Sequence, residues 1–465
     1  MFRRGRREAP VALPPFPPGF VWGTSTSAFQ IEGATDRDGR GVSAWDVFTA
    51  RPGAVRDGSD ATTATGHYDR YREDVALLAD LGVDAYRFSI AWTRVQPTGS
   101  GPVNQAGLDF YDRLVDELCA NGVKPAPTLF HWDTPQALEE AGGWQSRDTA
   151  DRFAEYAAVV AERLGDRVPM WITINEPAEL TLLGHALGEH APGKTLMFDA
   201  LPVAHHLLLA HGKAVQALRA AGADNVGLAA SHTPVWTAGD DDAARMGADL
   251  YDTLMNWLFS DPILTGRYPE GLAEAMPGPV ADDLKVISAP LDWYGVNYYN
   301  PTLVGAPDPS GQDAFGGIEL PDDLPFGIRE IEGPPRTDFD WPVVPDGLRE
   351  VLVTLKKRYG ADLPPIHITE NGCSYGDGPD ASGRVADTRR VEFLDGHLRA
   401  LREAIDAGVD VRGYFVWSLM DNFEWAEGHR QRFGLVHVDY ATLKRTPKDS
   451  YHWYRDMIAA SRQTG

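Results

Sequence analysis

The sequence contains little cysteine and lacks the motifs of common metal and nucleotide sites. Its 465 residues include only two cysteines, Cys119 and Cys373. This count excludes a disulfide framework and a CxxC metal site, and it gives no sign of an oxidising compartment. There is no HExxH, no HxH on a predicted strand, no GxGxxG after the first strand and no Walker lysine loop. We therefore expect no bound metal and no cofactor. The adjacent His205 and His206 point in different directions from an apolar helical stretch, so we interpret them as core or helix-surface residues.

Long apolar runs and positive charge are also scarce. No window approaches eighteen uncharged apolar residues, so we expect no membrane span and no membrane partner. The basic N-terminus lacks the apolar segment of a signal peptide, which predicts a cytoplasmic protein with residues 1–14 as a disordered lead. The formal net charge of −24 disfavours nucleic acid, anionic lipid and phosphorylated ligands as partners. The sequence leaves the oligomeric state open.

Apolar residues are plentiful enough for a large core. They make up 43% of the chain, and charged residues 24%, which is ordinary globular composition. Short apolar runs alternate with amphipathic stretches, the pattern of repeated βα units. We predict eight strands, at 19–27, 84–92, 123–132, 169–176, 225–232, 292–299, 365–371 and 411–420. Eight parallel strands with intervening helices close into a (β/α)8 barrel, the TIM barrel. No composition break marks a second domain within 15–465.

The segments between the predicted strands show helical periodicity. Apolar residues share one face of segment 108–122, and another such face recurs in segment 149–165. Segment 300–345 is different, because it is rich in proline, glycine and aspartate with weak periodicity. A loop of that length in a barrel is usually functional, so we expect it to form a wall of the active site.

Two predicted strands end in a glutamate beside an asparagine. Strand 169–176 ends in Asn175-Glu176, and strand 365–371 ends in Glu370-Asn371. In (β/α)8 barrels the active site lies at the C-terminal ends of the strands. Both glutamate side chains can therefore converge over the barrel mouth, and they predict a catalytic pair of carboxyl groups.

The other strand ends supply hydrogen-bonding groups and indole rings. They carry Gln30, Glu32, Arg87, His131, Trp132, Asn297, Tyr299, Trp417, Glu424 and Trp425. Sugars present hydroxyls at their edges and C–H groups on their faces, so sugar sites need both kinds of partner. The set predicts a carbohydrate site. Trp171 and Trp293 lie inside strands, and we interpret them as packing residues.

Seven motifs, in order along residues 15–460, together resemble glycoside hydrolase family 1. They read FVWGTSTSAFQIEGA, AYRFSIAWTRV, TLFHWDTPQAL, TINEP, GVNYY, HITENG and GYFVWSLMDNFEWAEG. This is the β-glucosidase family of retaining (β/α)8 glycosidases. The resemblance implies a small-molecule or oligosaccharide β-glycoside as substrate, terminal β-D-glucosyl residues as its reactive end, and a role in cellulose degradation.

The resemblance also implies roles for individual residues. Glu176 matches the family's acid/base and Glu370 its nucleophile. Arg87 and Tyr299 match residues that contact the nucleophile, and Asn297 lies near the acid/base. Contacts to the sugar are implied for Gln30, His131, Trp132, Asn175, Trp417, Glu424 and Trp425. Trp341 resembles an aglycone-side platform, with packing as the alternative interpretation.

The chemistry of retention fits this division of labour. It needs one carboxyl group to attack the anomeric carbon and another to protonate the leaving oxygen. An arginine beside Glu370 would favour the ionised form of a nucleophile, and Glu176 must start protonated. The leading hypothesis is a retaining β-glucosidase with side activity on β-galactosides and β-fucosides. A transglycosylating β-glycosidase and a sugar-binding pseudoenzyme are the alternatives, and the intact glutamate pair counts against the latter.

A few positions depart from the family pattern. Cys373 stands where alanine is frequent and His429 where a tyrosine is, and we expect both close enough to the mouth to alter aglycone preference. The branch that hydrolyses 6-phosphoglycosides holds the phosphate with serine, lysine and tyrosine in the loop after strand eight. Here that loop, 421–433, places Glu424 toward the sugar's 4- and 6-hydroxyls. The resemblance therefore implies a preference for free glucosides.

Overall fold

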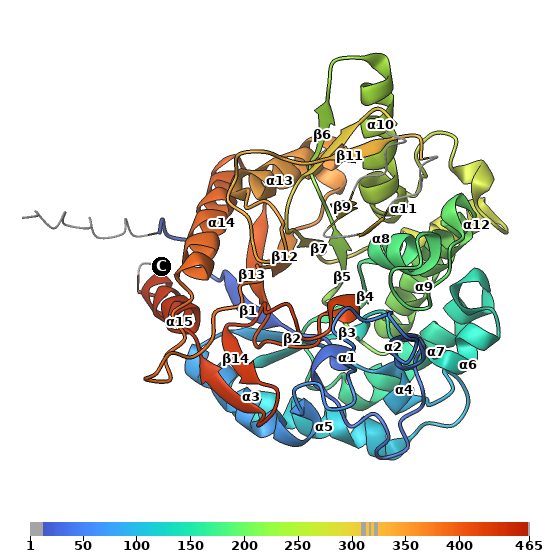
Figure 1. Ribbon diagram of the computed structural model, residues 1–465. Coiled ribbons are helices and arrows are strands. Elements are labelled where there is room, and N and C mark those ends of the chain that lie inside the picture. Colours follow the sequence, from blue (N-terminus) through green and yellow to red (C-terminus); the bar gives the residue numbers. More distant parts are fainter. Residues whose placement is uncertain (1–12, 308–312, 316–317, 320–323, 464–465) are drawn as a thin grey trace, which may run out of the picture.

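The protein is built around a closed barrel of eight parallel strands (Figure 1). The computed structural model describes residues 13–307, 313–315, 318–319 and 324–463. Around the barrel the strands follow the order β1-β13-β12-β7-β5-β4-β3-β2. Their bounds are β1 (Val21–Ser25), β2 (Ala85–Ser89), β3 (Lys124–Phe130), β4 (Trp171–Asn175), β5 (Val226–Ser231), β7 (Tyr294–Asn297), β12 (Ile366–Asn371) and β13 (Val411–Trp417). Each strand lies inside one of the eight predicted ranges, and the predicted (β/α)8 barrel is confirmed.

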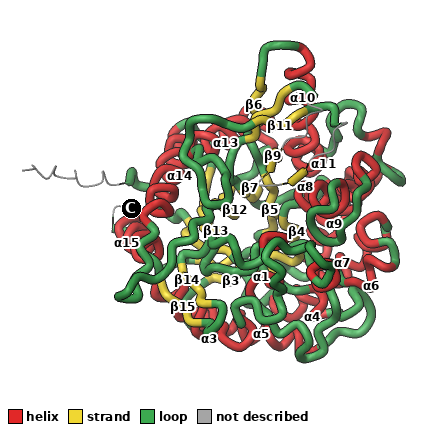
Figure 2. The backbone as a smooth tube through the Cα atoms, in the orientation of Figure 1, coloured by secondary structure: helices red, strands yellow, loops and turns green. Residues whose placement is uncertain are grey.

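Helices cover the outside of the barrel (Figure 2). The longer ones are α3 (His67–Leu81), α5 (Gln105–Ala120), α7 (Asp148–Leu164), α9 (Leu201–Ala220), α10 (Asp242–Asp252), α13 (Pro345–Tyr359), α14 (Thr388–Asp406) and α15 (Asp449–Ser461). Segments 108–122 and 149–165 are the helices α5 and α7, and the apolar face predicted for each is buried. These faces pack toward the strands because an amphipathic helix gains free energy by burying its apolar stripe.

Short helices shape the loops between the longer elements. They are α1 (Ala28–Ile31), α2 (Ala44–Thr49), α4 (Trp92–Val95), α6 (Gln136–Glu140), α8 (Pro177–Glu179), α11 (Leu258–Thr265) and α12 (Val280–Ile287). Single tight turns form η1 (Gly143–Gln145), η3 (Met197–Ala200), η5 (Ala273–Ala275), η6 (Gly360–Asp362) and η7 (Trp425–Glu427). Two wider helices of π type, η2 (Leu180–Ala186) and η4 (Thr253–Trp257), follow α8 and α10.

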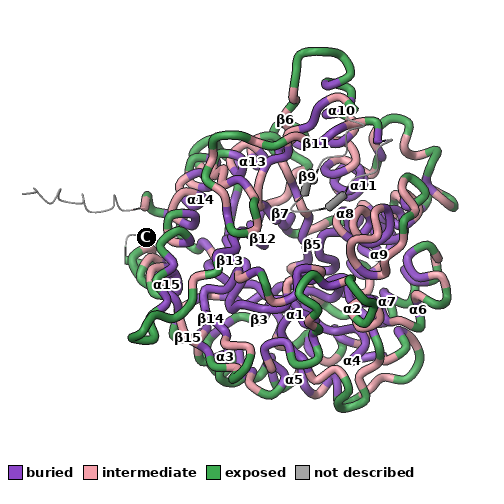
Figure 3. Tube along the Cα trace, viewed as in Figure 1, coloured by how far each residue is buried: buried purple, intermediate pink, exposed green. Residues whose placement is uncertain are grey.

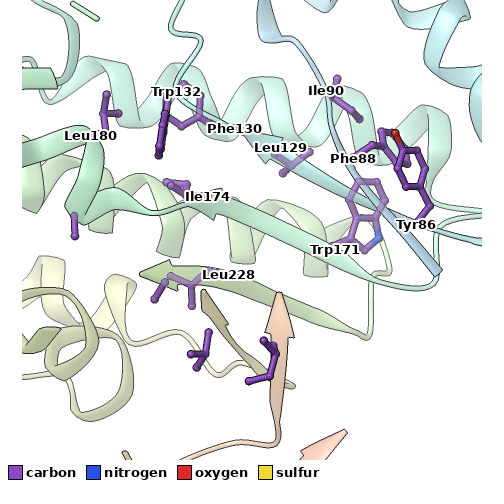
Figure 4. Packing of buried hydrophobic residues seen from close by; sticks show 14 of the residues in the cluster. Tyr86, Phe88, Ile90, Leu129, Phe130, Trp132, Trp171, Ile174, Leu180 and Leu228 are labelled. Atoms are coloured by element: carbon purple, nitrogen blue, oxygen red, sulfur yellow. The ribbon is translucent and has the colours of Figure 1, made fainter. Parts of the chain in front are cut away.

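Buried residues are concentrated in the barrel strands and on the inward faces of the helices (Figure 3). Figure 4 shows side chains of successive strands, among them Leu129, Ile174 and Leu228, within this core. Inside the barrel, Trp293 and Phe415 belong to a separate small cluster that fills its interior. A Cβ at Gly227 would lie 2.5 Å from the Trp293 ring, so this strand position requires glycine. Trp171 is also buried, and the packing roles expected for the two strand tryptophans are confirmed.

Segment 300–345 contains more regular structure than its sequence suggests. β8 (Thr302–Gly305) pairs with β6 (Val235–Ala238) and β11 (Gly327–Arg329) in a small three-stranded sheet at the barrel rim (Figure 1). Strands of three or four residues are too short to produce a clear alternation. The remaining strands are β9 (Asp313–Phe315), β10 (Ile318–Glu319), β14 (Val436–Asp439) and β15 (Lys444–Pro447).

Several further expectations concern single segments. His205 and His206 are buried in α9, where His205 Nε2 lies 3.0 Å from Asp283 Oδ2, so the core interpretation is confirmed. Residues 1–12 of the predicted lead lie outside the described residues, whereas Leu13 packs against the core. Within the described part of the chain, no helix combines the length and apolar character needed to cross a membrane.

Candidate active site

Glu176 and Glu370 meet at the C-terminal mouth of the barrel. Glu176 directly follows β4, and Glu370 is the penultimate residue of β12. Both are buried, and both line one cavity. Gly372 shows why the second motif continues with glycine, because a Cβ there would lie 1.8 Å from the carbonyl oxygen of Trp417. The close approach of β13 therefore fixes the course of the chain just after Glu370.

Glu370 is held by two hydrogen-bond donors. Nη1 of Arg87 lies 2.6 Å from Oε1, and the Tyr299 hydroxyl donates to Oε2 at 2.7 Å. Burial raises the pKa of Tyr299 well above its ordinary value, so the hydroxyl keeps its proton as a donor. A buried guanidinium and a donating hydroxyl both favour an ionised carboxylate. Glu370 is thus suited to act as a nucleophile.

Glu176 has a different environment. Its oxygens accept hydrogen bonds from two neutral amides, at 2.8 Å from Asn297 Nδ2 and 3.0 Å from Asn175 Nδ2. Burial, followed by the charges of Glu370 and Glu179, raises the pKa of Glu176 well above its ordinary value. This shift favours the protonated form, in which a general acid must start.

Asn175 connects the hydrogen-bond partners of Glu370 with those of Glu176. Its Oδ1 accepts from Arg87 Nη2 at 2.6 Å and from Asn297 Nδ2 at 3.1 Å. The Thr369 hydroxyl donates to Oδ1 of Asn297 at 2.5 Å, which turns the Asn297 amide nitrogen toward Glu176. The orientation of each amide is thereby determined by its neighbours, and the network positions both glutamates together.

At the far end of the cavity, Gln30 supports Glu424. Nε2 of Gln30 lies 3.3 Å from Oε2 of Glu424, and the Ser27 hydroxyl donates to Oε1 of Gln30 at 2.6 Å. Burial, with the charges of Glu370 and Glu427, raises the pKa of Glu424 to about 8. Glu424 is therefore mainly a neutral acid near pH 7, whereas the sequence suggested a charged carboxylate.

Aromatic rings form the inner wall of the cavity. The ring centroids of Trp132 and Trp425 are 4.7 Å apart, and those of His131 and Trp417 are 5.8 Å apart. Trp132 (φ 75°), Glu176 (φ 45°) and Trp425 (φ 47°) all adopt left-handed backbone conformations. Such conformations are strained for bulky residues and are typical of functional sites, where the surrounding structure enforces them.

Trp341 lines the cavity beside Tyr299. Its ring stacks on Phe339 with centroids 4.3 Å apart and lies 5.4 Å from the Tyr299 ring. Both Trp341 and Phe339 line the cavity. The position fits a platform for the aglycone, and the stacking shows that Trp341 also packs.

Some expected positions do not face the cavity. Gln30, Arg87 and Asn175 are fully buried and act through residues that line it. Cys373 is buried against Arg390, and His429 packs between Phe423 and Tyr440. Neither Cys373 nor His429 lines the cavity, so a direct effect of either on the aglycone, as expected from the sequence, does not follow.

Sequence reasoning missed several cavity residues. They include Arg56, Glu179, His190, Tyr251, Met255, Glu427 and Phe433. Arg56, His190 and Phe433 come from loops and the other four from helices at the mouth, and neither kind of position has a sequence signature. For Glu179 the sequence offered only its closeness to Glu176 along the chain.

Comparison with known proteins agrees with this geometry. The profile described as "Glycosyl hydrolase family 1" matches residues 13–463. The chain belongs to glycosyl hydrolase family 1. It is therefore a glycoside hydrolase, and the expected family is confirmed.

Relatives in family 1 match nearly the whole chain. "Thermostable beta-glucosidase B" from Thermobispora bispora is 47% identical, covering 95% of this chain and 90% of its own length. "Bifunctional beta-D-glucosidase/beta-D-fucosidase" from Bifidobacterium breve is 43% identical, covering 96% and 98%. The crystal structure of a psychrophilic beta-glucosidase from Micrococcus antarcticus superposes with a TM-score of 0.91 at 46% identity, covering 96% and 98%.

Proposed function

We propose that this family 1 enzyme is a retaining β-glucosidase in which Glu370 is the nucleophile and Glu176 the acid/base. The observation that carries the assignment is the asymmetry of their partners. Glu370 accepts from a guanidinium and a tyrosine hydroxyl, whereas Glu176 accepts from two amides. The first set favours a charged carboxylate, and the second, in a buried site, tolerates a neutral acid.

In the first step, an ionised oxygen of Glu370 attacks the anomeric carbon and forms a glycosyl ester. The bond from that carbon to the leaving oxygen breaks, and Glu176 gives its proton to this oxygen. Esterification removes the charge of Glu370. Because that charge raises the pKa of Glu176 in the free enzyme, its removal prepares Glu176 to act as a base.

In the second step, Glu176 takes a proton from a water molecule as its oxygen attacks the anomeric carbon. The ester bond breaks, and Glu370 leaves as a carboxylate again held by Arg87 and Tyr299. Two displacements at one carbon restore the original anomeric configuration. Asn175 does not line the cavity, and it contributes by holding Arg87 and Glu176 in place.

The substrate we propose is a small-molecule or oligosaccharide β-glycoside with a terminal glucosyl residue. Glu424 and the tryptophan rings supply the hydrogen bonds and apolar faces that a single sugar needs. The bifunctional relative supports side activity on β-fucosides, and β-galactosides differ from glucosides at one hydroxyl. Cellobiose and longer cello-oligosaccharides are candidate natural substrates.

The compartment we propose is the cytoplasm. Two cysteines that form no disulfide are in keeping with a reducing environment.

A mechanism-based label tests the assignment. A 2-deoxy-2-fluoro β-glucoside with a good leaving group should form a stable glycosyl-enzyme, and peptide mapping should place the label on Glu370. NMR of the first-formed product should show the β-anomer. A label on Glu176, or an α-anomer as first product, would contradict the proposal. Activity on cello-oligosaccharides compared with aryl β-fucosides and β-galactosides would then rank the substrates.

A further inference from the structure

The cavity wall next to Glu176 carries a third carboxyl group that the two-step mechanism does not use. Glu179 is the last residue of α8 and lies three residues after Glu176. Glu176 is the N-cap residue of this short helix, and the charge of Glu179 acts on its carboxyl group. Both side chains line the same cavity. Glu179 is thus a close neighbour of the acid/base.

A hydrogen bond from the barrel fixes the Glu179 side chain. The hydroxyl of Ser231, the last residue of β5, donates to Oε1 of Glu179 at 2.9 Å. Glu179 is partly exposed to the cavity, whereas Glu176 is buried. Burial raises the pKa of Glu179, and the hydrogen bond from Ser231 lowers it. Glu176 is buried beside the Glu370 charge, whereas Glu179 is partly exposed and is not paired with Glu370, so ionisation of the pair falls first on Glu179.

The groups around this pair come from several elements. Those facing Glu176 or Glu179 are Glu370 in β12, Arg87 in β2, Tyr299 after β7, Tyr251 in α10 and His232 after β5. Burial lowers the pKa of His232 to about 4, so this ring is neutral. Burial also keeps the tyrosine protons in place. Among these groups, Glu370 and Glu179 supply negative charge. The only positive charge among them is that of Arg87, whose guanidinium already binds Glu370 and Asn175.

We propose that Glu179 is a positioning residue for the proton of the acid/base: once ionised, it keeps that proton on Glu176 and so extends hydrolysis of glucosides with poor leaving groups to higher pH. The inference rests on the proposed role of Glu176. A second negative charge in the same cavity makes ionisation of Glu176 less favourable, because like charges in a poorly solvated site repel. Hydrolysis needs the Glu176 proton only where the leaving oxygen is basic.

The test is the pH profile of kcat/KM for Glu179→Gln. This change keeps the shape and removes the charge. With methyl β-glucoside, the basic limb of the profile should move to lower pH by about one unit. With 2,4-dinitrophenyl β-glucoside, whose leaving group needs no proton, the variant should show no such movement.

Matched variants distinguish an effect of the Glu179 charge from a change in the local structure. Glu179→Asp keeps the charge, so the basic limb of its kcat/KM profile should lie close to that of the wild type. Ser231→Ala removes the hydrogen bond that stabilises the Glu179 anion, so its limb should lie between those of wild type and Glu179→Gln. Glu162→Gln removes an exposed carboxyl group of α7 outside the cavity and should not move the limb.

Two outcomes would overturn the inference in different ways. If the Glu179→Gln limb stays in place while Glu176→Gln still discriminates between leaving groups, Glu179 has no such role and the proposed function stands. The same holds if Glu179→Gln changes only KM, which would make Glu179 an aglycone contact. If Glu176→Gln does not discriminate, the proposed function fails together with the inference.

Discussion

Nη1 of Arg87 lies 2.6 Å from Oε1 of Glu370, although the two residues are 283 positions apart in the chain. Arg87 is in β2 and Glu370 in β12, and β1 and β13 lie between these strands in the barrel. The ion pair therefore spans part of the barrel mouth, so the nucleophile is held correctly only once the barrel has closed.

Replacing Arg87 by lysine should reduce kcat/KM by up to about a hundredfold, because each hydrogen bond to a charged group contributes about 1.5–3 kcal/mol and the guanidinium fork is lost. Lysine offers one point charge, whereas Arg87 donates to Glu370, Asn175 and the Thr128 hydroxyl at once. Steady-state kinetics on an activated aryl glucoside would measure the loss, with circular dichroism to verify folding. A folded variant with wild-type kcat/KM would show that the several hydrogen bonds of the Arg87 guanidinium are not needed for catalysis.

Replacing Glu176 by glutamine should affect substrates according to their leaving groups. The variant cannot donate a proton, so alkyl glucosides should lose far more kcat/KM than dinitrophenyl glucosides. A plot of log kcat/KM against leaving-group pKa should become steeper than that of the wild type. Glu370→Gln is the matched control and should lose activity on every substrate. Equal losses across the series for Glu176→Gln would exclude the acid role.

The barrel and both glutamates could be predicted from the sequence because each has a local signal. Strand periodicity locates Ile366–Asn371, and the abrupt change from apolar to polar residues marks Glu370. Arg87 gave no such signal by itself, since its partner is set by the closure of the barrel. The residues missed, such as Phe433 and Met255, line the cavity from loops and a π-type helix. Their positions depend on tertiary packing rather than on local pattern.

The raised pKa of Asp133 could not be predicted from the sequence. Asp133 follows the predicted sugar contacts His131 and Trp132, yet it is buried with both carboxyl oxygens lacking a hydrogen-bond partner among the described residues. Burial raises the pKa of Asp133 to about 7. No motif reports such a desolvated acid, because desolvation depends on everything packed around it.

Because the pKa of Asp133 is raised, we expect the free energy of unfolding to decrease as the pH rises from mildly acidic to neutral. The folded pKa is raised above the unfolded one, so the stabilising contribution is fully present below about 4 and is lost as pH rises through about 7. Asp133→Asn has no titrating group and should gain stability relative to wild type over that interval, by a few kcal/mol at most. Urea unfolding of both proteins from pH 4 to pH 8 would measure the difference. A difference that does not vary with pH would contradict this prediction.

The last prediction concerns glucosides that carry a phosphate on the 6-hydroxyl. The two cations of loop 421–433 both face carboxylates, because Arg432 pairs with Asp421 at 2.8 Å and Arg430 lies 3.8 Å from Glu427. Of the described residues that line the cavity, Arg56 is the only lysine or arginine, and it forms an ion pair with Glu427. A phosphate dianion would find no free cation at the sugar end.

The pH dependence of this discrimination separates two explanations. Near pH 7 most of Glu424 is neutral, so the unphosphorylated glucoside should be preferred mainly because the phosphate lacks cationic partners. As pH rises through about 8, Glu424 ionises and adds repulsion of several kcal/mol at contact distance. The ratio of kcat/KM for the two aryl glucosides should therefore increase between pH 6.5 and pH 9. Taking the ratio cancels the loss of the Glu176 proton, which both substrates share, and the phosphate is already a dianion over most of the range. In Glu424→Gln the ratio should become independent of pH. Comparable kcat/KM for the two substrates in the wild type would mean that Glu424 does not face the 6-position, and a ratio that rises equally in Glu424→Gln would assign the effect to another group.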